Sequence, residues 1–412
     1  MRFPDYKDDW CKEKLGRLMD FKVTNSFSRN DLNYDNGAVK NIHYGDIHTK
    51  FQTLLDITRE EVPYVNKNIS LDRISDDYYC KEGDLVFADA SEDLIDVGKS
   101  IEILNLNNEK LLSGLHTLLA RPKQGLFFKG FNGYLFKSKN VRLQIQKEAQ
   151  GTKVLSISAR RISNIKLSFP SEKEQEKITS FLSRLDQRIQ TQSKIIENFE
   201  SLMIGLRQKI FLQKIRFKSN NGNKFPEWTK IQLGKLITKT GNKNKKNIQY
   251  PIYSINNKEG FLPQNEQFEG MNSNDRGYDI SLYKLIKKNT FAYNPARINV
   301  GSIGYSRDLE DVIVSSLYVC FKTKEELQDE YLYQYLETFP FKKDVLRYSE
   351  GGVRQYLFFE NFSKIKIPLP CIDEQIRIAN FLSSIDEKIE KEKYILEQYQ
   401  QQKKYLLQNL FI

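Results

Sequence analysis

The feature that most constrains this chain is a residue pattern that occurs twice at a constant offset of 200 residues. Glu174-Gln175 recurs as Glu374-Gln375, and Asp186 recurs as Asp386. Further residues repeat at the same offset, and the first copy holds Ile165-Lys166, Pro170, Ile178, Phe181-Leu182-Ser183 and Ile189. No insertion or deletion interrupts the match between 151–210 and 351–410. The chain is therefore a tandem duplication of one structural unit.

A shorter match opens each half of the chain. Its residues are Phe3-Pro4, Trp10 and Leu15-Gly16 in the first half and Phe225-Pro226, Trp228 and Leu233-Gly234 in the second. A polar, turn-rich segment between the halves has no hydrophobic period, which is typical of a linker. We therefore expect a first variable domain at 1–170, a first long helix at 171–216, a linker at 217–223, a second variable domain at 224–370 and a second long helix at 371–412.

Each predicted long helix carries a heptad seam, a row of mainly apolar residues spaced alternately by three and four. The first seam is Leu182, Leu185, Ile189, Gln192, Ile196, Phe199, Met203, Leu206 and Ile210, and the second is Leu382, Ile385, Ile389, Glu392, Leu396, Tyr399, Lys403, Leu406 and Leu410. One helix alone cannot bury such a stripe. We expect the two helices to pack together as an intramolecular antiparallel coiled coil. The alternative, in which each helix docks on its own domain or on a partner, stays open.

The two variable domains have the mixed pattern of an α+β fold. A strand closed by proline is expected before each long helix, at 164–170 and 364–370. Residues 84–88 and 290–294 are predicted to be equivalent strands. The β-branched and aromatic run at 311–323 indicates one or two buried strands. Short helices are expected at 111–119 and 326–335.

The charge balance and the duplication both favour a two-part polyanion as partner. Lys and Arg number 64 against 53 Asp and Glu, a net charge of +11, although solubility explains such an excess equally well. Two similar units related by a pseudo-two-fold axis fit a two-fold partner, and duplex DNA is one.

The remaining composition points to a soluble cytoplasmic protein. Four widely spaced cysteines, Cys11, Cys80, Cys320 and Cys371, suggest neither a zinc site nor a disulfide framework. The N-terminal residues have no apolar signal-peptide core, and no stretch is long and apolar enough to span a membrane.

The duplicated motif resembles that of the specificity subunits of type I restriction-modification systems. The resemblance rests on the run Glu-Gln-x-x-Ile-x-x-Phe-Leu-Ser-x-x-Asp-x-x-Ile at 174–189 and 374–389, with weaker support from the Phe-Pro opening, and it covers nearly the whole chain. It implies a non-catalytic subunit of a host-defence system, with two target-recognition domains that each read half of a split DNA sequence. It also implies an antiparallel helix pair between the domains, and assembly with two modification subunits and with restriction subunits. S-adenosylmethionine, ATP and magnesium would bind to those partners.

The motifs that the sequence lacks agree with this division of labour. A DNA adenine methyltransferase needs a glycine-rich cofactor loop and an Asn/Asp-Pro-Pro-aromatic motif, and Asn294-Pro295-Ala296-Arg297 lacks the second proline and the aromatic residue. No phosphate-binding GxxxxGK[ST] loop occurs. We expect no catalytic residue, no metal and no cofactor on this chain. Two other functions stay open, a stand-alone two-domain DNA-binding regulator and a nuclease with degenerate motifs.

DNA contacts require cations for phosphates and guanidinium or amide groups for base edges. The candidates in the second half are Lys243, Lys245, Lys246, Asn294, Arg297, Arg307, Arg354, Gln355 and Tyr356, and those in the first half are Thr152 and Lys153. The strongest are Arg354 to Tyr356, in the glycine-rich segment 351–356, with Lys153 in the repeated segment. Plain turns or a surface pair between Arg307 and Asp308 would account for several of them. The turn that contains His43 and His48 is expected to be structural.

Overall fold

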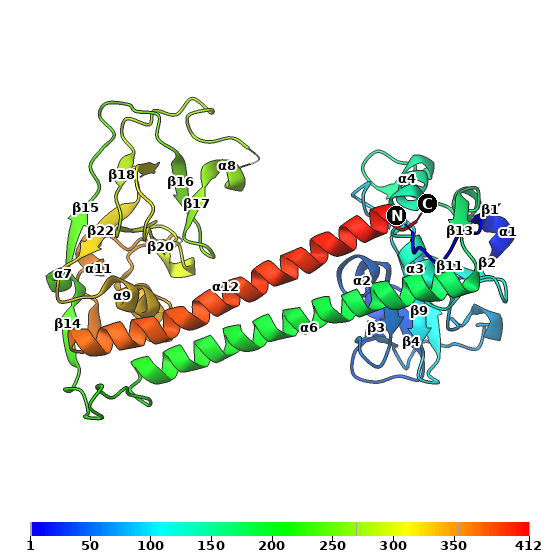
Figure 1. The fold of residues 1–412 in the computed structure, drawn as a ribbon, viewed down its shortest axis with the longest axis horizontal. Coiled ribbons are helices and arrows are strands. Elements are labelled where there is room, and N and C mark those ends of the chain that lie inside the picture. Colours follow the sequence, from blue (N-terminus) through cyan, green and yellow to red (C-terminus); the bar gives the residue numbers. More distant parts are fainter. Residues whose placement is uncertain (1, 269, 353, 412) are drawn as a thin grey trace. The chain divides into compact units, whose positions relative to one another are not determined.

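The computed structural model describes residues 2–268, 270–352 and 354–411. Its contacts divide the chain into two compact units, unit 1 (Met1–Ser193 with Tyr394–Ile412) and unit 2 (Lys194–Lys393). Each unit contains a mixed α/β domain and one stretch of each of the two long helices, α6 (Glu172–Phe211) and α12 (Ile372–Asn409) (Figure 1). In the described part of the chain no helix is both long and apolar enough to cross a membrane.

The domain of unit 1 contains a five-stranded sheet in the order β2-β11-β7-β9-β5 and a four-stranded sheet in the order β10-β4-β6-β3. The strands are β2 (Met19–Lys22), β3 (Leu32–Asn33), β4 (Lys40–Ile42), β5 (Leu54–Asp56), β6 (Tyr64–Val65), β7 (Leu85–Ala88), β9 (Ser100–Asn105), β10 (Leu111–Ser113) and β11 (Thr117–Pro122). Helix α2 (Tyr44–Thr49) connects β4 to β5, and α3 (Phe131–Leu135) and α4 (Lys139–Glu148) follow β11. Every residue of β7 is buried, which places this strand in the core.

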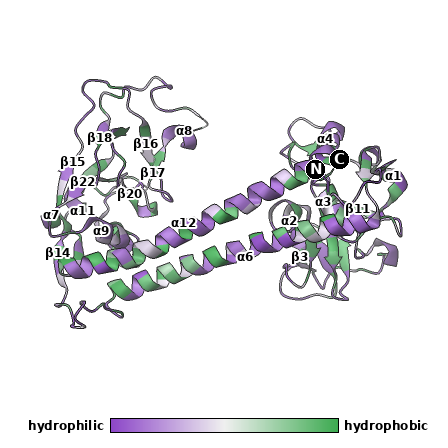
Figure 2. Ribbon diagram, in the orientation of Figure 1, coloured by the Kyte–Doolittle hydropathy of each residue, from purple (hydrophilic) through white to green (hydrophobic). Residues whose placement is uncertain are grey.

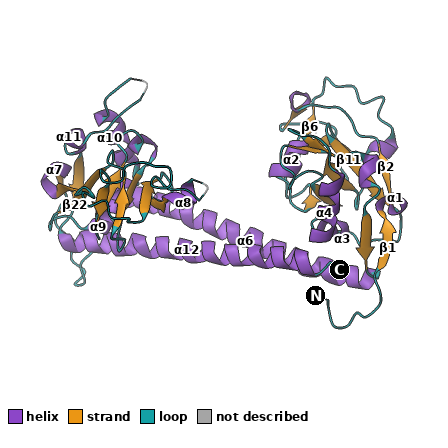
Figure 3. Ribbon diagram, turned by 90° about the horizontal axis from the view of Figure 1, so that it is seen from above, coloured by secondary structure: helices purple, strands orange, loops and turns teal. Residues whose placement is uncertain are grey.

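The domain of unit 2 contains two four-stranded sheets, in the orders β15-β22-β19-β20 and β17-β16-β21-β18. The strands are β15 (Ile237–Thr240), β16 (Ile252–Ile255), β17 (Phe261–Pro263), β18 (Lys284–Ile286), β19 (Phe291–Tyr293), β20 (Ile303–Tyr305), β21 (Val312–Val314) and β22 (Val319–Thr323). Helices α9 (Asp329–Leu336) and α10 (Phe339–Tyr348) follow β22. Strands and helices mix in both units (Figure 3), so the predicted α+β class is confirmed.

Strand register aligns four strands of the two domains residue by residue, although β5 of unit 1 has no counterpart among the described residues in the corresponding sheet of unit 2. Thr323 pairs with Ile237 as Pro122 pairs with Met19, and Phe291 lies opposite Phe321 as Leu85 lies opposite Ala120. Strands β19, β22, β15 and β20 therefore correspond to β7, β11, β2 and β9. The predicted equivalence of 84–88 with 290–294 is confirmed.

Small two-stranded sheets lead into both long helices. In unit 1, β1 (Cys11–Lys14) pairs with β13 (Lys166–Phe169), and in unit 2, β14 (Thr229–Gln232) pairs with β23 (Lys366–Leu369). The short helix α1 (Leu15–Leu18) comes directly after β1, and α7 (Leu233–Leu236) comes directly after β14. A Cβ on Gly16 or Gly234 would lie 3.0 or 2.9 Å from the Cβ of Ser163 or Ser363, which explains the repeated Leu-Gly.

One expected short helix is wrong. Residues 111–119 form β10, a turn and the start of β11, not a helix. A Cβ on Gly114 would lie 2.5 Å from the backbone oxygen of Ile42, and His116 has a φ of +55°, so this segment turns sharply between two strands. The helix expected at 326–335 exists as α9 but starts at Asp329, and 311–323 forms two strands, β21 and β22.

Within each unit the two long helices pack antiparallel. In unit 1, Lys403 of α12 forms an ion pair with Asp186 of α6. In unit 2, Lys393 pairs with Glu200 at 3.2 Å and Asp386 pairs with Arg207 at 3.9 Å. Residue numbers thus rise along one helix as they fall along the other, and apolar residues recur along both (Figure 2). Helix α6 ends at Phe211, five residues before the predicted boundary at 216.

The seam residues are buried to different degrees, and many of them join the core of a domain as well as the other helix. Those in the unit 1 core or packed against it are Leu182, Leu185, Ile189, Tyr399, Leu406 and Leu410, and those in or against the unit 2 core are Phe199, Met203, Leu206, Ile210, Leu382, Ile385 and Ile389. Ile196 is buried and Leu396 half-buried. The two packing modes predicted as alternatives therefore coexist.

The repeated Glu-Gln pair fastens each long helix to its domain. Glu174 accepts two hydrogen bonds from Arg2, and Glu374 accepts hydrogen bonds from Arg216 and from Trp228. Gln175 bonds the backbone of Leu126, Phe128 and Pro170, and Gln375 bonds that of Glu326, Gln328 and Pro370. These side chains are buried, so the motif holds the α/β domain at a defined place on the helix.

Candidate nucleic-acid interface

An open hollow of about 710 Å³ lies in unit 2 at the end of β19. We call it the unit 2 hollow, and its lining residues are Asn294, Pro295, Ala296, Arg297, Asn299, Val300, Leu317, Arg354, Tyr356 and Phe358. Four of these, Asn294, Arg297, Arg354 and Tyr356, are among the residues predicted to contact DNA. They come from segments about sixty residues apart, so the fold brings the candidates together.

The first wall of the hollow is a tight turn after β19. The side chain of Asn294 accepts a hydrogen bond from the amide of Ala296 at 3.0 Å, and the amide of Arg297 donates to the carbonyl of Asn294. Pro295 is buried, whereas Arg297 is exposed. The turn therefore fixes the backbone while leaving a guanidinium accessible to a ligand.

The second wall is a narrow loop closed by two backbone hydrogen bonds between Glu350 and Tyr356. Gly351 has a φ of +115°, and a Cβ there would lie 2.3 Å from the carbonyl oxygen of Arg354, so this loop requires glycine. The rings of Tyr356 and Phe358 are stacked, with centroids 5.8 Å apart. Val353 lies outside the described residues.

A backbone hydrogen bond joins the two walls, because the amide of Leu357 donates to the carbonyl of Pro295 at 3.0 Å. The hollow then offers two guanidinium groups, one amide and an aromatic face in one place. Arginine bonds guanine bidentately, asparagine bonds adenine and aromatic rings stack on bases. This combination suits a nucleic acid.

The other predicted DNA contacts of unit 2 do not line this hollow. Gln355 is half-buried beside it. Arg307 is held by Glu330, with nitrogen–oxygen distances of 2.7 and 3.2 Å, and not by Asp308. Lys243, Lys245 and Lys246 are exposed in a separate loop, in which the buried side chain of Asn244 bonds the backbone of Ile248 at 2.8 and 3.1 Å.

The equivalent place in unit 1 has different chemistry. The amide of Ile157 donates to the carbonyl of Asp89 as that of Leu357 donates to Pro295, so the same two segments meet. Gly151 has a φ of +124°, like Gly351. Thr152 and Lys153, which are predicted to contact DNA, are exposed in this loop. The counterparts of Asn294, Arg297, Arg354 and Tyr356 are Ala88, Ser91, Val154 and Ser156.

Sequence reasoning missed the apolar part of the unit 2 hollow. Leu317 is 78% exposed and Val300 is 51% exposed. Phe358 also lines the hollow and is not among the residues predicted to contact DNA. Leu317 lies in a run that was predicted to be buried strand. The signal that could have found it is the Ser-Ser pair before it, which marks a turn between two strands.

All three histidines lie around one tyrosine in unit 1. The ring centroid of Tyr44 lies 4.7 Å from that of His43, 6.3 Å from that of His48 and 5.4 Å from that of His116. Burial and the neighbouring Arg29 lower the pKa of His43. His48 bonds the carbonyl of Ala90 at 3.1 Å. The described residues contain no group of three His, Cys, Asp or Glu side chains that could hold a metal ion.

Two curated proteins of Methanocaldococcus jannaschii are similar to this chain. One is named as the MjaX specificity subunit of a type I restriction enzyme and is 28% identical over 343 residues, which cover 79% of this chain and 76% of the relative. The other is named as the MjaVIII specificity subunit and is 27% identical over 294 residues, 66% and 68% of the two chains.

Solved structures share the fold. The S subunit of a type I restriction-modification system from M. genitalium has a TM-score of 0.56 at 16% identity, over 98% of this chain and 96% of its own. A chain from a study of complex assembly in the type I system has a TM-score of 0.58 at 14% identity, over 98% of both chains.

A match to a family model shows which family the chain belongs to. It is described as the type I restriction modification DNA specificity domain, and it matches twice, over residues 7–201 and 227–400. Specificity subunits of this family recognise DNA, are not catalytic and bind no cofactor of their own, in agreement with what the missing motifs predicted. With both halves matched, the chain belongs to the family of type I restriction-modification DNA specificity proteins.

Proposed function

We propose that each unit of this chain recognises one half of a bipartite DNA target, and that the chain holds the modification and restriction subunits on that target. The observation that carries the proposal is the unit 2 hollow, where Arg297, Arg354 and Asn294 meet beside stacked aromatic rings. Guanidinium and amide groups are those that distinguish base pairs in the major groove. A second unit with the same strand register and a different lining suits a target whose two halves differ.

The partners and cofactors in this proposal follow from the family. Two modification subunits would supply S-adenosylmethionine and methylate adenine, and restriction subunits would supply ATP, magnesium and cleavage. The chain itself would contribute the base contacts and the surface for assembly. The net charge of +11 supports DNA as the partner.

The long helices would set the gap between the half-sites. Helix α6 is continuous from Glu172 to Phe211. At 1.5 Å per residue, the roughly 28 steps from Leu182 to Ile210 give about 42 Å. One turn of DNA is about 34–36 Å, so a spacer of this length could carry two domains to successive major grooves.

The experiment is methylome mapping of cells that express the chain with its modification partner. Inserting four residues beside Gln192 lengthens α6 by about 6 Å. We expect both half-sequences to persist and the gap between them to change by about two base pairs. The same four residues inserted between Asn220 and Asn221, in the loop after α6, form the matched control and should leave the gap unchanged. An altered half-sequence with the original gap would show that the helices do not set the distance.

A further inference from the structure

His116 of unit 1 and Leu317 of unit 2 occupy equivalent positions. Leu118 pairs with Phe87 as Val319 pairs with Tyr293. Counting two residues back from Leu118 and Val319 gives His116 and Leu317, in the turns before β11 and β22. Leu317 lines the unit 2 hollow, so His116 stands at the corresponding point of unit 1.

Both side chains are accessible to a ligand. Leu317 is 78% exposed, and the His116 side chain is 51% exposed. Exposing a leucine to this extent gains nothing from the hydrophobic effect within the unit. His116 has a φ of +55°, a left-handed backbone conformation that histidine adopts more readily than most residues other than glycine.

The neighbours of the two residues differ in a consistent way. The Nδ1 atom of His116 lies 3.3 Å from a carboxylate oxygen of Asp89, and the residue equivalent to Asp89 in unit 2 is Pro295. The amide of Asp89 also donates to the carbonyl of His116. Burial raises the pKa of Asp89, whereas the imidazole counteracts that shift. Unit 1 therefore presents an imidazole–carboxylate pair where unit 2 presents an aliphatic side chain.

These two surfaces suit different base edges. An imidazole can donate or accept a hydrogen bond, and a carboxylate accepts one from the amino group of cytosine. An exposed aliphatic side chain offers only apolar contact, and the thymine methyl group is the apolar feature of the major groove. The same backbone position thus carries polar recognition in one unit and apolar recognition in the other.

We propose that this position determines specificity in both units, with His116 and Asp89 bonding a base edge in one half-site and Leu317 contacting a thymine methyl group in the other. The inference rests on the proposed DNA-recognition function and assigns residues to it. Arg354 and Arg297 would act beside Leu317, but unit 1 has no arginine at the equivalent positions. Its half-site would therefore depend more heavily on the His116–Asp89 pair.

The test uses the full chain with its modification partner and a DNA library randomised in both half-sites. We expect His116→Leu and Asp89→Asn to change the preferred base at one position of one half-site, with roughly tenfold to hundredfold weaker discrimination. Leu317→Ser should weaken the preference for thymine at one position of the other half-site only. Lys12→Ala and Lys230→Ala, at equivalent exposed positions of β1 and β14, are the matched controls and should leave both half-sites unchanged.

His116→Asn is a second variant that should fold even if His116→Leu does not, because asparagine tolerates the left-handed backbone conformation. If His116→Leu does not fold, a changed base preference in His116→Asn still supports the inference. Wild-type preferences at every position in His116→Asn, Asp89→Asn and Leu317→Ser would overturn it. If the wild-type complex shows no sequence preference at all, the proposed function fails instead.

Discussion

Units 1 and 2 share the register of four strands and the buried Glu-Gln pair of each long helix. They differ in the residues at the position of the unit 2 hollow and in the loop at 77–84 of unit 1. Gln175 bonds the backbone of unit 1 as Gln375 bonds that of unit 2, and Glu174 and Glu374 each accept hydrogen bonds from an arginine. After the equivalent strands β19 and β7, by contrast, unit 2 has Arg297 where unit 1 has Ser91. Residues that hold the domain on the helix repeat, and residues open to a ligand do not. A duplicated scaffold can therefore support two different recognition surfaces.

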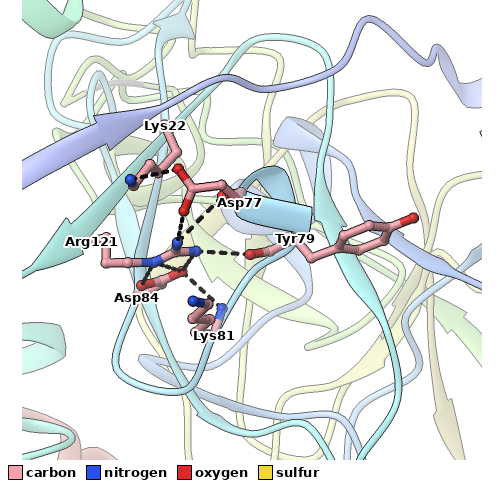
Figure 4. Close-up of polar contacts among 6 residues, drawn as sticks. All are labelled: Lys22, Asp77, Tyr79, Lys81, Asp84 and Arg121. Carbon is pink, nitrogen blue, oxygen red and sulfur yellow. Dashed lines mark hydrogen bonds and ion pairs between the residues drawn. The ribbon is translucent and has the colours of Figure 1, made fainter. Parts of the chain in front are cut away.

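A further structural difference is an ion network in unit 1 (Figure 4). Arg121 of β11 donates to both carboxylate oxygens of Asp84, to Asp77 and to the carbonyl of Tyr79. Lys22 of β2 bonds Asp77 at 2.7 Å. Burial alone would lower the pKa of Arg121, but the bonds to Asp84 raise it. The network fixes the loop at 77–84, and in unit 2 the residues equivalent to Arg121 and Asp84 are Lys322 and Thr290.

Removing the centre of this network should have the largest effect of the substitutions considered. Arg121→Ala leaves the buried carboxylate of Asp84 without its cation, and breaking such a pair costs about 3–5 kcal/mol. Lys322→Ala, the matched substitution in unit 2, should cost less than about 1 kcal/mol. Hydrogen exchange measured by mass spectrometry reads each unit separately, which a single melting curve does not. Equal loss of protection in the two variants would show that the network contributes no special stability.

The tryptophans that precede β1 and β14 differ in their hydrogen bonding, and a smaller effect on stability is expected from their substitution. The indole nitrogen of Trp228 donates to Glu374 at 2.8 Å, whereas that of Trp10 meets no hydrogen-bond acceptor among the described residues. Trp228→Phe should destabilise unit 2 by about 2 kcal/mol, because a hydrogen bond to a charged group is lost. Trp10→Phe should destabilise unit 1 less. Denaturant unfolding followed by hydrogen exchange compares the two, and a larger loss in Trp10→Phe would contradict the assignment.

The loops that begin at Gly151 in unit 1 and at Gly351 in unit 2 should also differ in how they contact DNA. Arg354 lines the unit 2 hollow, and Lys153 is exposed in the repeated loop of unit 1. If Arg354 bonds a base, Arg354→Ala should weaken specific binding by about 1–3 kcal/mol and relax one base position. If Lys153 contacts phosphate, Lys153→Ala should reduce the salt dependence by about one unit for all sequences. Titrations at several salt concentrations separate these outcomes, and unchanged affinity and slope in both variants would remove the loops from the interface.

The sequence predicted the parts of the molecule that depend on periodicity. The heptad seams indicated both long helices, and the 200-residue repeat indicated two equivalent domains. It failed at 111–119, where a short helix is expected but Gly114 and His116 form a turn. It also missed Phe358, because exposure of an apolar residue depends on tertiary contacts that local pattern does not encode. Leu317 was missed because the β-branched run around it outweighed the turn signal of Ser315-Ser316. The placement of Arg297 next to Arg354 likewise follows from the hydrogen bond between Leu357 and Pro295, which joins distant segments.

The smallest effect is expected at Arg307, in contrast with Arg297 ten residues before it. Arg307 forms two bonds to Glu330, and its guanidinium lies 4.7 Å from the ring centroid of Tyr333. These contacts hold the guanidinium against Glu330 and Tyr333, and Arg307 is not among the residues that line the hollow. Arg307→Ala should therefore leave DNA affinity and base preference unchanged, whereas Arg297→Ala should weaken binding by about 1–3 kcal/mol if it reads a base. Titration with the preferred DNA measures both. A loss in Arg307→Ala as large as that in Arg297→Ala would mean that the DNA-contacting surface of unit 2 extends beyond the hollow to β20.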